Sequence, residues 1–154
     1  MRGISTTVIK SSWNKLLFES SLPSERLRVC VILPVRNEAL HIEATLEALR
    51  NELDLAGSPL DPSSYEVLLL ANNCSDNTHN ISVQYQKQYP DFLLRTAAVD
   101  LPVADANIGT VRRMLMDEAC HRFDIIDNKS GIIASTDGDT TVDAQWISFI
   151  IKEK

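Results

Sequence analysis

The sequence predicts an α/β fold in which helices cover both faces of a mainly parallel sheet. Two observations lead to this expectation. Apolar runs alternate four times with segments in which apolar residues recur at helical spacing, and strands that alternate with helices form βαβ units with parallel strands. The chain has 154 residues, 44% of them hydrophobic, which suits one globular domain with a core of its own.

The first strand and helix are expected after a polar lead-in over residues 1–27, which includes a short helix around residues 13–18. Residues 28–35, "RVCVILPV", are β-branched and apolar, as in a buried strand. Residues 37–53 then change to helical spacing, with Asn37 placed to cap the helix. The apolar positions of this stripe are Leu40, Ile42, Leu46, Leu49 and Leu53.

The second strand and helix follow a loop rich in Gly, Pro and Ser. Residues 65–71, "YEVLLLA", form the predicted strand. Ser75 or Asp76 is placed to cap a helix over 77–89, which ends before Pro90.

The third and fourth units complete the alternation. Residues 92–99 and 131–136 are the predicted strands, and residues 107–123 the helix between them. A last helix begins after Asp143, which is expected to cap it. The core positions of the 107–123 helix are Val111, Met114, Leu115, Ala119 and Phe123.

Charge and cysteine usage exclude several classes of function. A net charge of −6 with scattered Lys and Arg argues against binding to nucleic acid or anionic lipid. Three widely spaced cysteines without a CxxC pair indicate neither a disulfide framework nor a zinc site. The chain shows no signal peptide and no run of about 20 apolar residues, so we expect a cytoplasmic chain without a transmembrane segment.

Polar residues follow three of the predicted strands. Arg36, Asn37 and Glu38 follow the first, Asn72 and Asn73 the second, and Asp137 and Asp139 the fourth. Ligands of open parallel sheets bind beyond the carboxyl ends of the strands. We therefore expect all three clusters to meet at one ligand-binding edge.

The stretch "STDGDTT" places two carboxylates one residue apart at the end of a strand. A simple Asp-Gly turn is one explanation, but a helix rather than a second hairpin strand follows it. Two adjacent carboxylates are tolerated where a divalent cation neutralises them, and their hard oxygens suit Mn²⁺ or Mg²⁺ with phosphate and water as the other ligands. The pattern favours a metal with a phosphate-bearing ligand.

Four stretches in this order resemble the family 2 glycosyltransferases. They are "VCVILPVRNEALHIEATLEAL", "YEVLLLANNCSDNT", "ANIGTVRRMLMDEA" and "STDGDTTVDAQWI". The resemblance implies a Rossmann-like sheet of the GT-A type over residues 28–154, truncated after the DxD motif. It also implies a nucleotide-diphosphate sugar as the ligand and transfer of its sugar to an acceptor that the sequence does not identify.

The resemblance carries roles to individual residues. It places Asp137 near the ribose and the metal, and Asp139 as the ligand of the metal that bridges the diphosphate. Arg112 or Arg113 would add positive charge at the diphosphate, with a solvated helix face as the alternative for both. The implied nucleotide-sugar-binding residues are Pro34, Val35, Arg36, Asn37, Glu38, Asn72, Asn73, Arg112, Asp137 and Gly138.

The chain departs from the family pattern after the second strand. "ANNCS" puts Ala71 and Asn72 where the family commonly has two acids, one of which reads the base. An Asn side chain accepts a hydrogen bond but also donates one, so the base of the donor stays open. An Asx-type turn is the alternative role for Asn72 and Asn73.

No residue matches the family's general base, a carboxylate from the part of the domain after the DxD motif. We therefore expect a donor-binding half that is inactive alone and that works with a missing C-terminal half. Two alternatives remain. Asp137, Asp139 and Thr141 also spell the DxDxT pattern of haloacid-dehalogenase-type phosphotransferases, and the chain would equally suit a non-catalytic nucleotide-binding module.

Overall fold

The structure is a computed structural model that describes residues 16–18 and 20–153. Most of the short helix expected around residues 13–18 lies outside the described residues, and residues 16–18 are not helical. The strands are β1 (Val29–Val35), β2 (Tyr65–Asn72), β3 (Leu94–Val99) and β4 (Ile132–Ser135). The helices are α2 (Ile42–Arg50), α3 (Thr78–Gln88), the 3₁₀ turn η1 (Val103–Asp105), α4 (Ile108–Ile125) and α5 (Trp146–Glu153).

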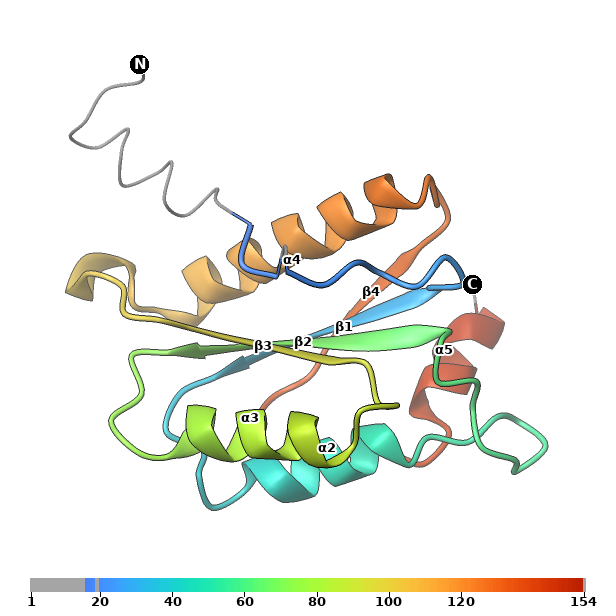
Figure 1. The fold of residues 1–154 in the computed structure, drawn as a ribbon, viewed down its shortest axis with the longest axis horizontal. Coiled ribbons are helices and arrows are strands. Elements are labelled where there is room, and N and C mark those ends of the chain that lie inside the picture. The colour runs from blue at the N-terminus through green and yellow to red at the C-terminus, as the bar shows by residue number, and fades with distance from the viewer. Residues whose placement is uncertain (1–15, 19, 154) are drawn as a thin grey trace.

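The four strands form one parallel sheet in the order β3-β2-β1-β4. Val35 at the end of β1 pairs with Ala71, and Asn72 at the end of β2 pairs with Val99. The predicted α/β class and the parallel sheet are thus confirmed, with helices on both faces (Figure 1). All carboxyl ends of the strands lie at one edge.

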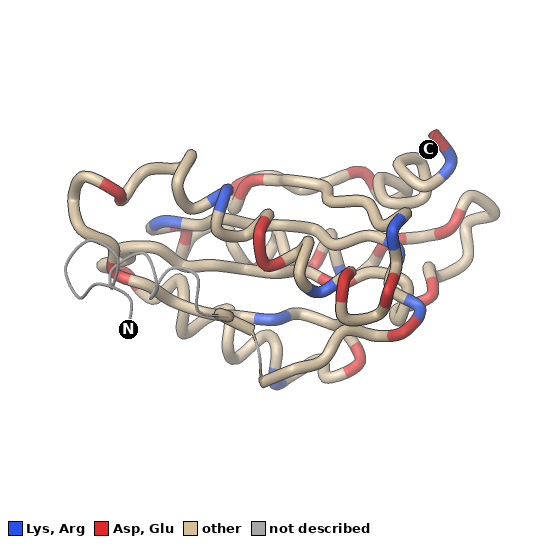
Figure 2. Tube along the Cα trace, turned by 90° about the horizontal axis from the view of Figure 1, so that it is seen from above, with Lys and Arg blue, Asp and Glu red and all other residues tan. Residues whose placement is uncertain are grey.

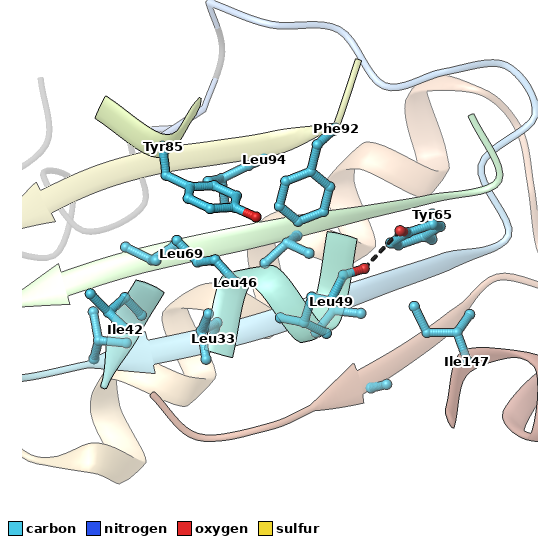
Figure 3. Packing of buried hydrophobic residues seen from close by; sticks show 14 of the residues in the cluster. Leu33, Ile42, Leu46, Leu49, Tyr65, Leu69, Tyr85, Phe92, Leu94 and Ile147 are labelled. Atoms are coloured by element: carbon cyan, nitrogen blue, oxygen red, sulfur yellow. Dashed lines mark hydrogen bonds between the residues drawn. The ribbon is translucent and has the colours of Figure 1, made fainter. Parts of the chain in front are cut away.

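Helices α2 and α3 cover one face of the sheet through a continuous apolar cluster (Figure 3). Ile42, Leu46 and Leu49 of α2 are fully buried against alternate residues of β1 and β2, as expected of a helical stripe on a sheet. The buried Tyr65 hydroxyl donates a hydrogen bond to the Leu49 carbonyl oxygen at 2.7 Å.

Helix α4 covers the opposite face, and all five of its predicted core residues are buried. Arg122 of this helix forms a buried ion pair with Glu66 of β2, with Nε 2.5 Å from Oε2. Glu118 accepts hydrogen bonds from the backbone N–H groups of Leu17 and Phe18. The described part of the lead-in therefore packs on α4.

The predicted start of α2 was wrong. Asn37 does not cap the helix, which begins at Ile42 after an N-cap residue, His41, whose side chain makes no capping bond. Asn37 instead has a φ of 54°, which takes the chain out of helical geometry at this point. Leu40, assigned to the apolar stripe, is 93% exposed in the resulting loop, and Leu53 lies beyond the end of α2.

Two predicted caps, Asp76 and Asp143, do accept hydrogen bonds near the starts of their helices, and Asn107, which was not predicted as a cap, caps α4. Asn107 accepts a hydrogen bond from the Thr110 N–H at 2.9 Å, and Asp76 accepts one from the Thr78 N–H at 3.0 Å. Helix α5 begins three residues after Asp143, whose Oδ2 accepts from the Gln145 N–H.

After β4, the chain turns at the carboxyl edge and runs back on the α2 side to α5, near the amino ends of the strands (Figure 1). The Leu53 N–H donates to the Ala144 carbonyl oxygen at 2.7 Å, and the Ile147 N–H donates to Glu52 Oε1 at the same distance. No helix among the described residues is long and apolar enough to cross a membrane.

Candidate functional site

The carboxyl edge of the sheet brings together the loops that follow β1, β2 and β4. Hydrogen bonds between side chains and backbone join the loop after β1 to the loop after β2 and to the first residue of α3. Asn37 Oδ1 accepts from the Ser75 N–H at 2.8 Å, and Asp76 Oδ2 accepts from the Ala39 N–H at 3.1 Å. Thr78 Oγ1 accepts from the Glu38 N–H at 2.8 Å. These bonds fix the two loops as one unit.

Asp76 is the central acceptor of this unit. The Thr78 hydroxyl, followed by the backbone N–H groups of Thr78 and Ala39, holds the pKa of the Asp76 carboxyl below its usual range. Hydrogen bonds to the charged form of a carboxyl favour ionisation. Asp76 is thus an ionised structural acceptor at neutral pH.

The two asparagines at the end of β2 differ in their surroundings. Asn73 has a φ of 51°, a region that Asn tolerates better than most residues. Its side chain closes a ring with Leu101, donating from Nδ2 to the carbonyl oxygen at 2.9 Å and accepting from the N–H at 3.2 Å. Asn72 is the last residue of β2 and is only 4% exposed.

The loop after β1 presents a mixture of buried and exposed groups. Pro34 and Val35 are buried in the strand, so they offer a ligand little besides backbone atoms. Arg36 and Asn37 are exposed, and the Arg36 guanidinium donates to the Ala106 carbonyl oxygen at 3.4 Å. Arg36 thereby links this loop to the segment before α4.

Asp137 and Asp139 are exposed on either side of a buried glycine. A Cβ atom at Gly138 would lie 2.7 Å from Val35 Cγ1 and 3.0 Å from Glu38 Cγ, so only glycine fits against the end of β1. The Thr45 hydroxyl of α2 donates to the Gly138 carbonyl oxygen at 2.7 Å. The turn with both carboxylates is therefore anchored by its middle residue.

Arg112 of α4 brings positive charge to the same place. Its Nη2 lies 3.6 Å from Asp137 Oδ1, and its Nε is buried without a hydrogen-bond partner in the described part of the chain. Arg113, the alternative from the sequence, is exposed. Elsewhere the acidic and basic residues are scattered along the described chain (Figure 2).

The donor set at this edge fits a hard divalent cation. Asp137 and Asp139 supply carboxylate oxygens on an open surface, the ligand type that Mn²⁺ and Mg²⁺ prefer. Within residues 16–18 and 20–153, no group of three or more His, Cys, Asp or Glu side chains is placed to hold a metal. Oxygens of a bound ligand and water would complete the coordination of a metal on these two carboxylates.

Thr45 and Thr78, whose side chains hold the edge loops in place, were not predicted from the sequence, and Asp76 was predicted only as a helix cap. Thr45 had a recognisable signal. It lies in α2 at a fully buried position between Ile42 and Leu46, where the helical stripe calls for an apolar side chain. A hydroxyl at such a position needs a partner, and that partner is the Gly138 carbonyl oxygen.

The sheet and its helices define a Rossmann-like α/β protein, and the carboxyl edge of its sheet carries a pair of exposed carboxylates. The sequence model described as "Glycosyl transferase family 2" matches residues 30–106. The chain therefore belongs to family 2 of the glycosyltransferases, and the family resemblance of its motifs is confirmed.

Individual relatives agree with this assignment. The glycosyltransferase AglE of Haloferax volcanii is 28% identical over 119 residues, which cover 77% of this chain and 33% of AglE. The chain thus spans about a third of the length of this curated relative.

Solved structures of S. aureus TarS share the fold. TarS residues 1–349 in complex with UDP match with a TM-score of 0.56 at 15% identity, over 82% of this chain and 31% of that chain. TarS itself matches with a TM-score of 0.57 at 15% identity, over 82% of this chain and 19% of that chain. At this identity the match shows the GT-A-like fold.

Proposed function

We propose that residues 28–154 form the donor-binding part of a metal-dependent glycosyltransferase, which holds a nucleotide-diphosphate sugar at the carboxyl edge of the sheet. The observation that carries the proposal is the anchored Asp137–Gly138–Asp139 turn in a chain of glycosyltransferase family 2. TarS residues 1–349, which share the fold, have been solved with UDP and with UDP-GlcNAc.

In this proposal the two aspartates hold Mn²⁺ or Mg²⁺ against the diphosphate. A metal held there would supply Lewis-acid stabilisation of the departing nucleoside diphosphate. Arg112, whose Nε has no partner within the described residues, adds a fixed positive charge at the same place. Arg36, Asn37, Glu38 and Asn72 border the nucleotide at the ends of β1 and β2.

We further propose that the acceptor site and the general base are supplied by residues outside this chain, which spans 33% of AglE. Transfer requires an acceptor hydroxyl in line with the anomeric carbon and a base within hydrogen-bond reach of its proton. The 154-residue chain incubated with Mn²⁺, UDP-GlcNAc and simple glycoside acceptors should then bind the donor without forming a glycoside.

Calorimetry on the purified chain tests the donor site. UDP and GDP are titrated separately, each with Mn²⁺ and with EDTA in its place. We expect binding of at least one nucleotide in the presence of Mn²⁺ and loss of most of it in EDTA, because the carboxylates otherwise repel the diphosphate. Equal affinity in both conditions would remove the metal from the proposal.

Family membership favours this function over the phosphotransferase alternative with its DxDxT pattern. The two differ in the chemistry of Asp137, which would be a phosphoryl nucleophile in the alternative. Incubation with beryllofluoride and Mg²⁺ distinguishes the two functions, because beryllofluoride bound to a nucleophilic aspartate mimics an aspartyl phosphate. We expect no adduct, and a stable complex at Asp137 would support the phosphotransferase.

A further inference from the structure

We propose that Thr45 is a positioning residue that sets the orientation of the two aspartates for metal binding. This inference rests on the proposed function of the edge as a metal and nucleotide site. Thr45 lies near the middle of α2, and 93 residues separate it from Gly138. Its side chain touches neither the metal nor the nucleotide in this proposal, and it acts through the backbone of the turn.

The hydroxyl of Thr45 has one proton and two acceptors within reach. The Gly138 carbonyl oxygen lies at 2.7 Å, and the His41 carbonyl oxygen of the preceding helical turn lies at 3.2 Å. The shorter distance is the usual one for an O–H···O bond, so the proton belongs to the bond with Gly138. Thr45 is fully buried, and water does not compete for this bond.

Gly138 is restrained on its other side by close packing. A Cβ at this position would meet Val35 Cγ1 at 2.7 Å, which places the backbone of the turn directly on the end of β1. The hydroxyl of Thr45 thus fixes the direction of a carbonyl group whose position is already fixed by contact. Together these two restraints define the plane of the peptide between Gly138 and Asp139.

The orientation of this peptide plane determines where both carboxylates lie. Asp137 lies before this peptide and Asp139 directly after it, so a change in ψ of Gly138 that φ of Asp139 does not compensate turns the Cα–Cβ direction of Asp139 relative to that of Asp137. Metal ligands must lie within a few tenths of an ångström of their required distances. Residues behind the ligands that fix this geometry typically change metal affinity about 10–100-fold when they are removed.

Loss of the hydroxyl would leave the buried Gly138 carbonyl oxygen without its partner. A buried acceptor without a hydrogen bond is unfavourable, and the peptide is then expected to rotate toward water. A purely structural hydroxyl would lower stability alone, whereas a positioning hydroxyl lowers metal affinity in a protein that is still folded.

The test compares Thr45→Val, which removes the hydroxyl at nearly constant shape, with Thr45→Ser, which keeps it. Ser82→Ala is the matched control, because the Ser82 hydroxyl is also fully buried in a helix and donates to the Thr78 carbonyl oxygen at 2.8 Å. Mn²⁺ binding is followed by electron paramagnetic resonance with UDP or GDP present, and folding by thermal melting.

We expect Thr45→Val to weaken Mn²⁺ binding about ten-fold or more, while Thr45→Ser and Ser82→Ala stay within about two-fold of the original protein. If Thr45→Val does not fold, Thr45→Ala takes its place in the same comparison. Unchanged Mn²⁺ affinity in the hydroxyl-free variant, or an equal loss in Ser82→Ala, would overturn the inference and leave the proposed function standing. Nucleotide binding by the original chain that is indifferent to Mn²⁺ would overturn both.

Discussion

The Nη2 atom of Arg112 lies 3.6 Å from Oδ1 of Asp137, while no ion pair reaches Asp139 among the residues that the structure describes. The two carboxylates of the turn are therefore unequal. Asp137 forms an ion pair with the Arg112 guanidinium, which is itself partly exposed, and such a pair contributes little to stability. Asp139 is the carboxylate that no guanidinium of the described residues pairs with.

The first prediction follows from this inequality. Asp139→Asn should weaken Mn²⁺-dependent nucleotide binding more than Asp137→Asn, because it removes the carboxylate that no guanidinium compensates. We expect a loss of more than about ten-fold for Asp139→Asn, comparable at least to loss of a residue that orients a metal ligand. Calorimetry with UDP or GDP and Mn²⁺ measures both variants. The reverse order would exchange the roles of the two aspartates.

The second prediction concerns the neighbouring arginines of α4. Arg112→Gln should weaken nucleotide diphosphate binding about ten-fold, since a hydrogen bond to a charged group contributes about 1.5 kcal/mol or more. Arg113→Gln carries the same change in net charge one residue along the helix, where the side chain is exposed.

Arg113→Gln should therefore leave the affinity within about two-fold. Titrations at low and high salt separate direct contact from long-range attraction, because salt screens the latter. Equal losses in both variants would mean that only the overall charge of the helix matters.

The fold could be predicted because the positions of apolar residues along the chain distinguish its strands from its helices. "RVCVILPV" and "YEVLLLA" are continuous apolar runs, and their alternation with helical stripes leaves a parallel sheet as the arrangement that buries both. The error at Asn37 arose from the same local reasoning. A cap residue is a preference of the local sequence, but the bond from the Ser75 N–H to Asn37 Oδ1 spans 38 residues.

Only those residues of the site that lie directly after a strand could be placed from the predicted topology. Topology placed Asp137 and Asp139 at the carboxyl edge, and the family resemblance added Arg112 or Arg113. The 3.6 Å distance between Arg112 and Asp137 agrees with both. The bond of Thr45 to Gly138 and that of Thr78 to Glu38 join distant segments. The apolar stripe of α2 marks Thr45 as a buried hydroxyl that needs a partner, but the identity of that partner depends on how distant segments meet in the folded core, for which a single sequence has no periodic signal.

The third prediction tests the close packing of Gly138. Gly138→Ala places a Cβ 2.7 Å from Val35 Cγ1, and overpacking of this kind costs about 1–3 kcal/mol. Urea unfolding measures the loss. Val35→Ala in the same chain removes the opposing methyl groups, so the double variant should lose less than the sum of the two single variants. Strict additivity would show that the turn moves away freely.

The fourth prediction concerns Glu52, a carboxyl at the opposite edge of the sheet. Only 2% of Glu52 is exposed. Its Oε1 accepts from the Ile147 N–H of α5 at 2.7 Å, and its Oε2 has no partner within the described part of the chain. Burial, and secondarily Asp143, raises the pKa of Glu52 from 4.5 to about 7, against the opposing effect of the Ile147 N–H.

A raised pKa of an acid means that the folded chain binds this proton more tightly than the unfolded chain. The contribution of Glu52 to stability is complete below pH 4.5, declines as the pH rises, and is lost above about pH 7. At 1.36 kcal/mol per unit, the difference between pH 4.5 and pH 8 is about 3 kcal/mol. Glu52→Gln removes this proton while its amide oxygen still accepts from Ile147.

Urea unfolding of both proteins at pH 5, 6, 7 and 8 gives the difference in free energy of unfolding at each pH, in which all other titrating groups cancel. We expect the original protein to lose stability relative to Glu52→Gln as the pH rises from 5 to 8. Glu43→Gln, an exposed change in α2, should show a flat difference. A flat difference for Glu52→Gln as well would mean that Glu52 ionises at its ordinary pH and that water reaches its carboxyl in the folded protein.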